Sequence, residues 1–142
     1  MTFLGVDPGA SGGFGTVGQL ADAVAFKMPE TERDIVDTLK KFKEWGQVFA
    51  VIEEVHSMPK QGVASSFKFG MSYGGLRMAL IALEIPFRSV TPQKWQKELQ
   101  CLSRGDKNVT KRRAQELFPK LKITHAVADA ILLAEYCRRT HV

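Results

Sequence analysis

The sequence predicts an α/β fold in which a mixed five-stranded sheet is flanked by helices. Three segments of strand length come first, at residues 2–7, 14–19 and 21–27, and strand and helix patterns then alternate along the chain. A later segment, QVFAVIE at residues 47–53, is almost entirely apolar. Such a run is typical of a strand that is covered on both faces in the middle of a sheet.

The first three strands are expected to form an antiparallel meander. TFLGVD is followed by the turn-forming residues PGASGG and then by FGTVGQ, and the third strand ends near Lys27. Pro29 closes the meander. A helix then begins after Thr31, a favoured capping residue, and ends at Gly46; its apolar positions recur at helical spacing and are Ile35, Leu39 and Phe42.

The second half of the chain alternates between helices and loops. Residues 56–62 are expected to form a loop, and residues 63–83 a long helix whose glycines suggest close packing or a kink; these are Gly70, Gly74 and Gly75. Residues 85–90 read as a last short strand and residues 92–100 as a short helix.

Two helices complete the prediction. After a polar loop at residues 102–108, Thr110 is expected to cap a helix over KRRAQELF that ends at Pro119. The final helix begins near Thr124 and ends in Arg138 and Arg139.

The size and charge of the chain narrow its function. With 142 residues, 44% of them hydrophobic, it is expected to form one domain with its own core. Lys and Arg total 20 against 15 Asp and Glu, so the net charge is +5, which fits a polyanionic partner. An ordinary solvated basic face would produce the same balance.

The location is expected to be the cytoplasm. The two cysteines, Cys101 and Cys137, have neither zinc-site spacing nor the number of a disulfide framework. The N-terminus lacks the features of a secretion signal, and no apolar stretch approaches the roughly 18 residues that span a bilayer. We therefore expect no membrane association.

Four polar residues are candidates for a catalytic metal site. Asp7 and Glu53 end two apolar strands, and the carboxyl ends of neighbouring strands form the crevice where α/β sheets usually bind ligands. His125 and Asp129 are four apart on one helix and project to the same side. Carboxylate oxygens suit Mg²⁺ or Mn²⁺. Two such ions, about 4 Å apart, would activate a water and stabilise the leaving oxygen in phosphodiester hydrolysis.

Three of the four candidates also have a simpler interpretation, whereas Asp129 is harder to explain in another way. Asp7 precedes Pro8 and Gly9 and could be a turn-forming residue. Glu53 has Glu54 beside it, and because successive side chains of a strand point to opposite faces of the sheet, only one of the two can face the candidate site. We choose Glu53 as the site residue because it directly ends the apolar run. Asp129 lies in the apolar segment ADAILLA, where an unpaired carboxylate is costly. His125 is either a ligand, a base that orients water, or a surface residue near a helix start.

Three blocks of the sequence resemble the active-site motifs of a known family. GVDPGASGGFG, VIEEVHS and HAVADAILLAEYCRR are similar, in order and spacing, to the active-site blocks of RuvC-type Holliday junction resolvases. TPQKWQKEL and VTKRRAQELFP resemble the linking region of the short forms encoded by bacteriophages.

The resemblance implies a single RNase H-like nuclease domain over residues 1–142. It further implies a crossover junction endodeoxyribonuclease that nicks four-way DNA junctions symmetrically as a homodimer, with two Mg²⁺ or Mn²⁺ ions in each active site, in the host cytoplasm if the chain is phage-encoded. Asp7, Glu53 and Asp129 match family metal ligands. His125 stands where many relatives carry a carboxylate.

Basic residues that flank the candidate site are expected to contact DNA phosphates. The candidates are Lys60, Lys68, Arg104, Lys107, Lys111 and Arg112, while Arg113, Arg138 and Arg139 also lie nearby in sequence. Phe67, Phe69 and Tyr73 would form either a dimer interface, which is preferred, or a wedge that stacks on an unpaired base.

Three other functions are open at this stage. The chain could be a broader RNase H-like nuclease acting on branched or flap DNA. It could be a noncatalytic junction-binding protein. An actin-like sugar kinase or ATPase also begins with a strand, an Asp and a Gly-rich loop, but such proteins need two domains of this kind.

Overall fold

The computed structural model describes residues 1–20, 22–54 and 62–142, and it contains one mixed sheet. Its strands are β1 (Thr2–Asp7), β2 (Gly13–Gly18), β3 (Ala23–Lys27), β4 (Val48–Glu53) and β5 (Phe87–Val90), in the spatial order β3-β2-β1-β4-β5. The pairs β1–β2 and β2–β3 are antiparallel, whereas β1–β4 and β4–β5 are parallel. The predicted α/β fold with a mixed five-stranded sheet is confirmed.

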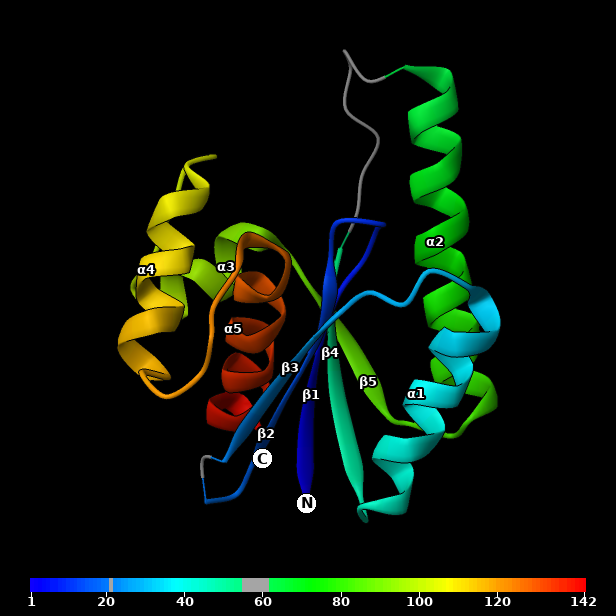
Figure 1. The fold of residues 1–142 in the computed structure, drawn as a ribbon, viewed down its shortest axis with the longest axis horizontal. Helices are drawn as coiled ribbons and strands as arrows, with labels where there is room; N and C mark the ends of the chain where they lie inside the picture. The colour runs from blue at the N-terminus through cyan, green and yellow to red at the C-terminus, as the bar shows by residue number, and fades with distance from the viewer. Residues whose placement is uncertain (21, 55–61) are drawn as a thin grey trace.

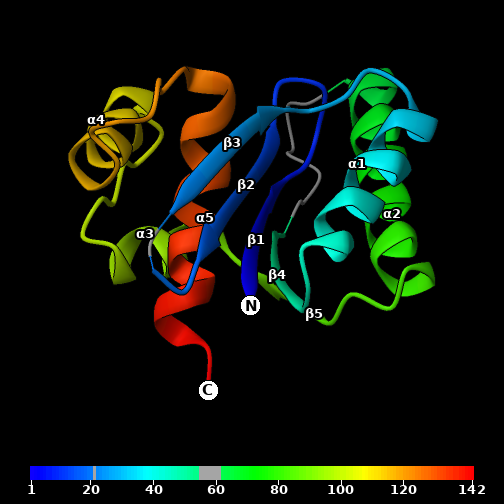
Figure 2. The ribbon, with the colours of Figure 1, turned by 60° about the horizontal axis from the view of Figure 1, so that its bottom comes forward.

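Helices cover both faces of this sheet. Figure 1 shows α1 (Glu32–Glu44) and α2 (Val63–Ala82) on one face, and α3 (Pro92–Glu98), α4 (Lys107–Leu117) and α5 (His125–Thr140) on the other. Figure 2 shows the same two helical layers from the end of the sheet at which both termini lie. In the described part of the chain, no helix is long and apolar enough to cross a membrane.

Strand alternation divides the core into two halves. Leu4 and Val6 of β1 point toward α1 and α2, where they join Leu39, Phe42 and Leu80. Phe3 lies in the other half, with residues from α3, α4 and α5. The odd-numbered positions of β1 therefore face α5, and by the same alternation Val51 of β4 does too.

Two glycines let α5 lie directly on the sheet. A Cβ atom built on Gly5 would lie 2.2 Å from the Ala130 carbonyl oxygen, and one built on Gly15 would lie 2.6 Å from the same atom. A side chain at either position would hold the helix away from β1 and β2. The glycines thus set how closely α5 approaches the carboxyl end of β1.

Helix α4 begins one turn earlier than predicted. Asp106, not Thr110, is its N-cap, and the Asn108 main-chain N–H donates to Asp106 Oδ1 at 3.0 Å. Both residue types cap helices well, so packing decides between them. Because the helix starts at Lys107, Thr110 lies within it, and both Thr110 and Ala114, four residues apart, lie on its buried side. The polar loop predicted at residues 102–108 is correspondingly shorter.

The glycines of α2 differ from the sequence prediction that they mark close packing or a kink. The long helix predicted at residues 63–83 is confirmed, since α2 runs without a break from Val63 to Ala82. A Cβ atom on each of the three helical glycines would meet no atom of another described element within 4 Å, so they mark no close packing against the described part of the chain; they are Gly70, Gly74 and Gly75. The loop predicted at residues 56–62 and the start of the third strand at residue 21 lie largely or wholly outside the described residues.

Candidate functional site

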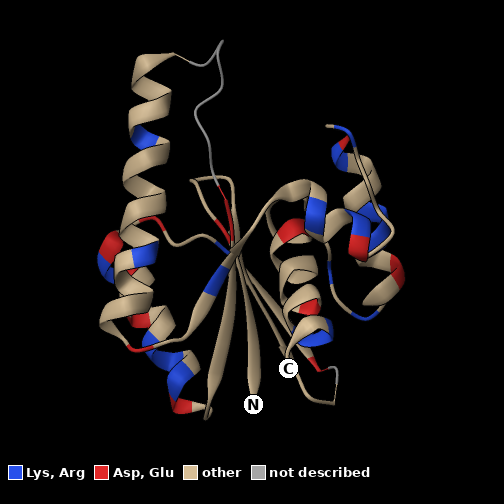
Figure 3. Cartoon of the chain, turned by 180° about the vertical axis from the view of Figure 1, so that it is seen from behind, with Lys and Arg blue, Asp and Glu red and all other residues tan. Residues whose placement is uncertain are grey.

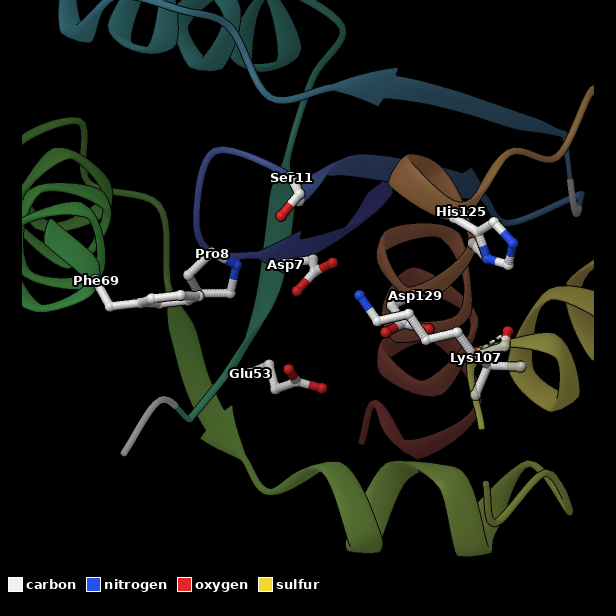
Figure 4. A pocket seen from close by; sticks show the side chains of 11 residues that line it. Asp7, Pro8, Ser11, Glu53, Phe69, Lys107, His125 and Asp129 are labelled. Atoms are coloured by element: carbon white, nitrogen blue, oxygen red, sulfur yellow. Dashed lines mark hydrogen bonds between the residues drawn. The ribbon is translucent and has the colours of Figure 1, made fainter. Parts of the chain in front are cut away.

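A pocket of about 210 Å³ opens at the carboxyl ends of the central strands. Figure 4 shows acidic side chains from three separate elements facing it, with a lysine reaching in from α4. The lining residues are Asp7, Pro8, Ser11, Gly12, Glu53, Phe69, Lys107, Thr110, His125, Ala128 and Asp129. All four predicted catalytic residues therefore border one pocket.

Parallel pairing of β1 with β4 brings Asp7 and Glu53 together. Val6 lies opposite Ile52 in the register, so the next residues of both strands end the sheet at the same edge. Asp7 continues the row of β1 that faces α5, and Glu53 continues the corresponding row of β4. Glu54 lies beyond the strand end, where its main-chain N–H donates to the Val90 carbonyl oxygen at 2.8 Å.

Helix α5 contributes the other two predicted residues. His125 is its first residue and is exposed, whereas Asp129 lies one turn further on, beside Ala128, and is largely buried. Residues four apart share a helix face, which explains why both border the pocket. Figure 4 shows Asp129 on the side of Asp7 and His125 at the outer rim.

The three carboxyl groups disfavour one another's negative charge. Burial raises the pKa of Asp7 well above its usual range, and the charges of Glu53 and Asp129 raise it further. Burial likewise raises the pKa of Glu53 to about 7, partly offset by a hydrogen bond from Trp95. Burial also raises the pKa of Asp129. Such a cluster is stabilised by added positive charge.

Lys107 supplies part of that charge. Its ammonium group lowers the pKa of both Asp7 and Asp129, and Figure 4 shows the side chain extending from α4 toward these two carboxylates. The sequence placed Lys107 only among residues beside the DNA. The earlier start of α4 is what brings it to the pocket.

Two residues that contact the predicted acids were missed by the sequence analysis. The Trp95 indole N–H donates to Glu53 Oε2 at 2.6 Å. The buried Thr110 hydroxyl forms a hydrogen bond that lowers the pKa of Asp129, and it also lies 3.3 Å from the Lys107 carbonyl oxygen. Its single proton can serve only one of these acceptors at a time. The TPQKW segment was noted as part of a motif, but nothing in it indicated a partner for Glu53.

The aromatic residues of α2 differ in position. Phe69 borders the pocket and packs against Gly9, which has φ +102. Ser72 Oγ accepts a hydrogen bond from the Gly9 main-chain N–H at 3.2 Å, so the loop after β1 is tied to α2. Phe67 is exposed, whereas Tyr73 packs against the α1–α2 half of the core. Their predicted role in a dimer interface stays a prediction.

The predicted DNA-binding residues fall into separate groups. Arg104 and Arg112 are exposed, Lys111 is half-buried and Lys68 is exposed on α2, while Lys60 lies outside the described residues. Figure 3 shows acidic positions at the ends of the central strands and basic positions on the neighbouring α4. Arg138 and Arg139 pair instead with Glu135, at 2.7 and 2.8 Å.

The acids share a pocket without forming a closed metal site. Among residues 1–20, 22–54 and 62–142, no three His, Cys, Asp or Glu side chains form a group that could hold a metal ion as they stand. Asp7, Glu53 and Asp129 line one pocket, and two of them raise the pKa of the third. The chemistry of this donor set fits a divalent cation, because hard carboxylate oxygens and uncompensated negative charge are what such ions bind.

Comparison with known proteins identifies the fold. No protein-family model and no curated protein matches the sequence. A Thermus thermophilus RuvC structure superposes with a TM-score of 0.67 at 17% identity, covering 96% of this chain and 92% of that one. T. thermophilus RuvC in complex with a Holliday junction substrate superposes with a TM-score of 0.64 at 18% identity, covering 99% and 96%. The chain thus has the RNase H-like fold of RuvC across almost its whole length, as its motifs implied.

Proposed function

We propose that this chain is a metal-dependent endonuclease that resolves four-way DNA junctions by symmetrical nicking. One observation carries the proposal: Asp7, Glu53 and Asp129 come from three elements and border one pocket at the carboxyl edge of the sheet. The fold adds support, because a RuvC with the same fold has been captured with a Holliday junction substrate. Residues 1–142 would act as one nuclease domain in the cytoplasm.

Asp7, Glu53 and Asp129 would hold Mg²⁺ or Mn²⁺, with two ions per site. Asp7 would help to hold both ions, since the charges of both Glu53 and Asp129 act on it. When bound, the ions would activate a water and neutralise the charge that develops on the phosphate. An ion bound among the carboxylates would relieve the repulsion that they exert on one another.

The other pocket residues would position the substrate. Lys107 would bind a phosphate oxygen beside the carboxylates, and His125, at the rim, would bind an ion or move a proton to or from water. Phe69 offers an aromatic face at the pocket edge for a base. Arg104, Lys111 and Arg112 would extend the phosphate contacts away from the acids.

A homodimer would use the outer face of α2. Large apolar side chains of this helix are exposed; they are Val63, Phe67, Phe69, Met71, Met78 and Ile81. The open space around Gly74 and Gly75 would admit the backbone of a second helix. An apolar helix left uncovered on a water-soluble chain is unfavourable, which favours a partner at this face.

The dimer is tested by sedimentation with Phe67→Ser combined with Met71→Ser. The parent should sediment as a dimer and the double variant as a monomer. Leu20→Ser changes another fully exposed apolar residue and should leave the dimer intact. A monomeric parent at cleavage-competent concentrations would remove the symmetrical-nicking part of the proposal.

Cleavage of defined DNA tests the activity. A synthetic four-way junction and a linear duplex of equal length are incubated with Mg²⁺, Mn²⁺ or EDTA, using the parent, Asp7→Asn and Asp37→Asn. Asp37 is an exposed acid on α1 and serves as the matched control. Paired nicks confined to the junction, dependent on metal and lost only in Asp7→Asn, are expected. Equal cutting of the duplex would favour a broader nuclease, and junction binding without cutting would favour a noncatalytic protein.

A further inference from the structure

Trp95 makes the closest polar contact to the Glu53 carboxylate. Its indole N–H donates to Glu53 Oε2 at 2.6 Å, which is short for a hydrogen bond from nitrogen. Trp95 is fully buried, whereas Glu53 borders the pocket. The indole thus joins the hydrophobic core to one of the candidate metal ligands.

The pairing of β4 with β5 brings Trp95 close to Glu53. Strand β5 runs parallel to β4, with Val90 opposite Glu53 at the strand ends. The next residue, Thr91, caps α3, and its Oγ1 accepts from the Lys94 main-chain N–H at 3.3 Å. Trp95 follows one helical turn later, beside the end of β4.

The indole is enclosed by the core. Trp95 is fully buried and belongs to the same buried cluster as Leu99, Cys101 and Ala114. A side chain that is already ordered by packing loses little further conformational entropy when it holds a partner in place. We therefore expect its N–H to stay directed at Glu53 when an ion binds.

We propose that Trp95 is a positioning residue, whose indole N–H fixes the Glu53 carboxylate in the orientation that receives a divalent cation. The inference rests on the proposed function, since it assigns Glu53 as a metal ligand. A simpler explanation is that Glu53 merely satisfies a buried N–H donor. The two explanations differ in one measurable quantity: only positioning makes the affinity for metal depend on Trp95.

Loss of the donor should weaken metal binding. The protein contains two tryptophans, so Trp45→Phe leaves Trp95 as the single indole. Trp45 is half-exposed at the end of α1, on the other face of the sheet, which makes this variant a suitable background. Mn²⁺ binding without DNA is measured by electron paramagnetic resonance. Adding Trp95→Phe should raise the Mn²⁺ Kd by about 10- to 100-fold, the usual effect of removing a residue that orients a ligand.

Two further measurements separate positioning from packing. In Trp45→Phe, Mn²⁺ should quench the Trp95 emission with the same Kd. Glu53→Gln should raise that Kd, while Asp7 and Asp129 should still bind the ion measurably. In the Glu53→Gln background, Trp95→Phe should cause no further loss of affinity, because the ligand it positions is gone. Additive losses in the double variant would overturn the proposal.

A variant of the same volume covers a failure of Trp95→Phe to fold. Benzothienylalanine replaces the indole N–H by sulfur, and in the Trp45→Phe background it enters only at position 95. It should raise the Mn²⁺ Kd as Trp95→Phe does.

The outcomes that overturn the inference are distinct from those that overturn the proposed function. An unchanged or lower Mn²⁺ Kd in both Trp95 variants would show that the indole only packs, or that it competes with the ion. In that case the parent would still bind Mn²⁺ and cut junctions. A parent that neither binds Mn²⁺ at the pocket nor cuts a junction would remove both.

Discussion

Gly5 and Ala130 are in direct contact, and this contact sets the distance between β1 and the helix that carries Asp129. A Cβ atom on Gly5 would lie 2.2 Å from the Ala130 carbonyl oxygen and 2.4 Å from the Ala134 main-chain nitrogen. Because both obstacles are backbone atoms, Gly5→Ala should push α5 outward. We expect a loss of about 1–3 kcal/mol in the free energy of unfolding, as for other overpacked cores. Urea denaturation measures it.

The displacement should also reduce cleavage. Asp7 and Asp129 are brought to one pocket by this packing, so Gly5→Ala should lower the junction-cleavage rate even at temperatures where the variant is folded. Gly62→Ala is the control, since a Cβ there meets no atom of the described residues within 4 Å and its φ is an ordinary −63. Equal stability of Gly5→Ala and Gly62→Ala would contradict the close approach.

The elements and the acids were predictable because each has a local signal. The apolar runs of β1 and β4 end at Asp7 and Glu53, and strand alternation together with parallel pairing sends both toward α5. The choice of Glu53 over Glu54 agrees with this register. The spacing of His125 and Asp129 predicted that both would face one side of a helix.

The contacts around the acids were not predictable, because they depend on long-range packing. Trp95 lies 42 residues from Glu53 and reaches it only through the β4–β5 pairing. The start of α4 depends on whether Asp106 or Thr110 caps the helix, and both are good capping residues. Burial of Thr110 against α5 decides it, and that choice brings Lys107 into the pocket.

Asp7→Asn should stabilise the protein in EDTA while abolishing cleavage. The Asp7 carboxylate is buried close to Glu53 and Asp129, so ionising it in the folded state is costly, whereas the unfolded chain ionises it freely. An amide removes that cost, and we expect a gain of roughly 1–2 kcal/mol in the free energy of unfolding near neutral pH. Urea denaturation in EDTA tests this. In saturating Mg²⁺ the parent should instead be more stable than Asp7→Asn, because a folded state that binds the ion more tightly gains more free energy of unfolding from it.

The metal-free parent should become more stable as the solution is made mildly acidic. The pKa of Glu53 is about 7 in the folded protein against 4.5 ordinarily, so the folded state binds the proton more tightly. The favourable contribution is complete below the ordinary value and is lost as pH rises through about 7. The free energy of unfolding in EDTA, measured by urea denaturation, should therefore be larger at about pH 5.5 than at pH 8, by roughly 1–3 kcal/mol. Glu53→Gln should show a smaller change, and an identical profile would contradict the assignment.

Lys107→Met should reduce cleavage far more than binding. The ammonium group acts on both Asp7 and Asp129, so under the proposed function it would lie beside the phosphate to be cut. Removing such a charge typically lowers the rate by about 100- to 1,000-fold. Junction affinity, which depends on many phosphate contacts, should fall less than about tenfold. Single-turnover kinetics and binding curves separate the two. Lys40→Met, at an exposed position of α1, should change neither the rate nor the affinity. An equal fall in affinity and rate for Lys107→Met would assign Lys107 to binding alone.

Glu135→Gln should destabilise the end of α5 and change its response to acid. Glu135 is 4% exposed and pairs with Arg138 at 2.7 Å and with Arg139 at 2.8 Å. Although burial alone would raise the pKa of Glu135, the hydrogen bonds and charges of the two arginines hold it below its usual range. Its stabilising effect is therefore present above the ordinary pKa of 4.5 and is lost as pH falls through the lower pKa of the folded state.

Because both arginines are about one-third exposed, we expect Glu135→Gln to lose only about 1–2 kcal/mol in the free energy of unfolding at neutral pH. Glu116→Gln, which breaks a 3.2 Å pair with Arg113 at a half-exposed site, should cost less than about 0.5 kcal/mol. Thermal unfolding from pH 3 to 7 distinguishes them, and equal small losses for both variants would contradict a stabilising role for the pairs of Glu135 with the two arginines.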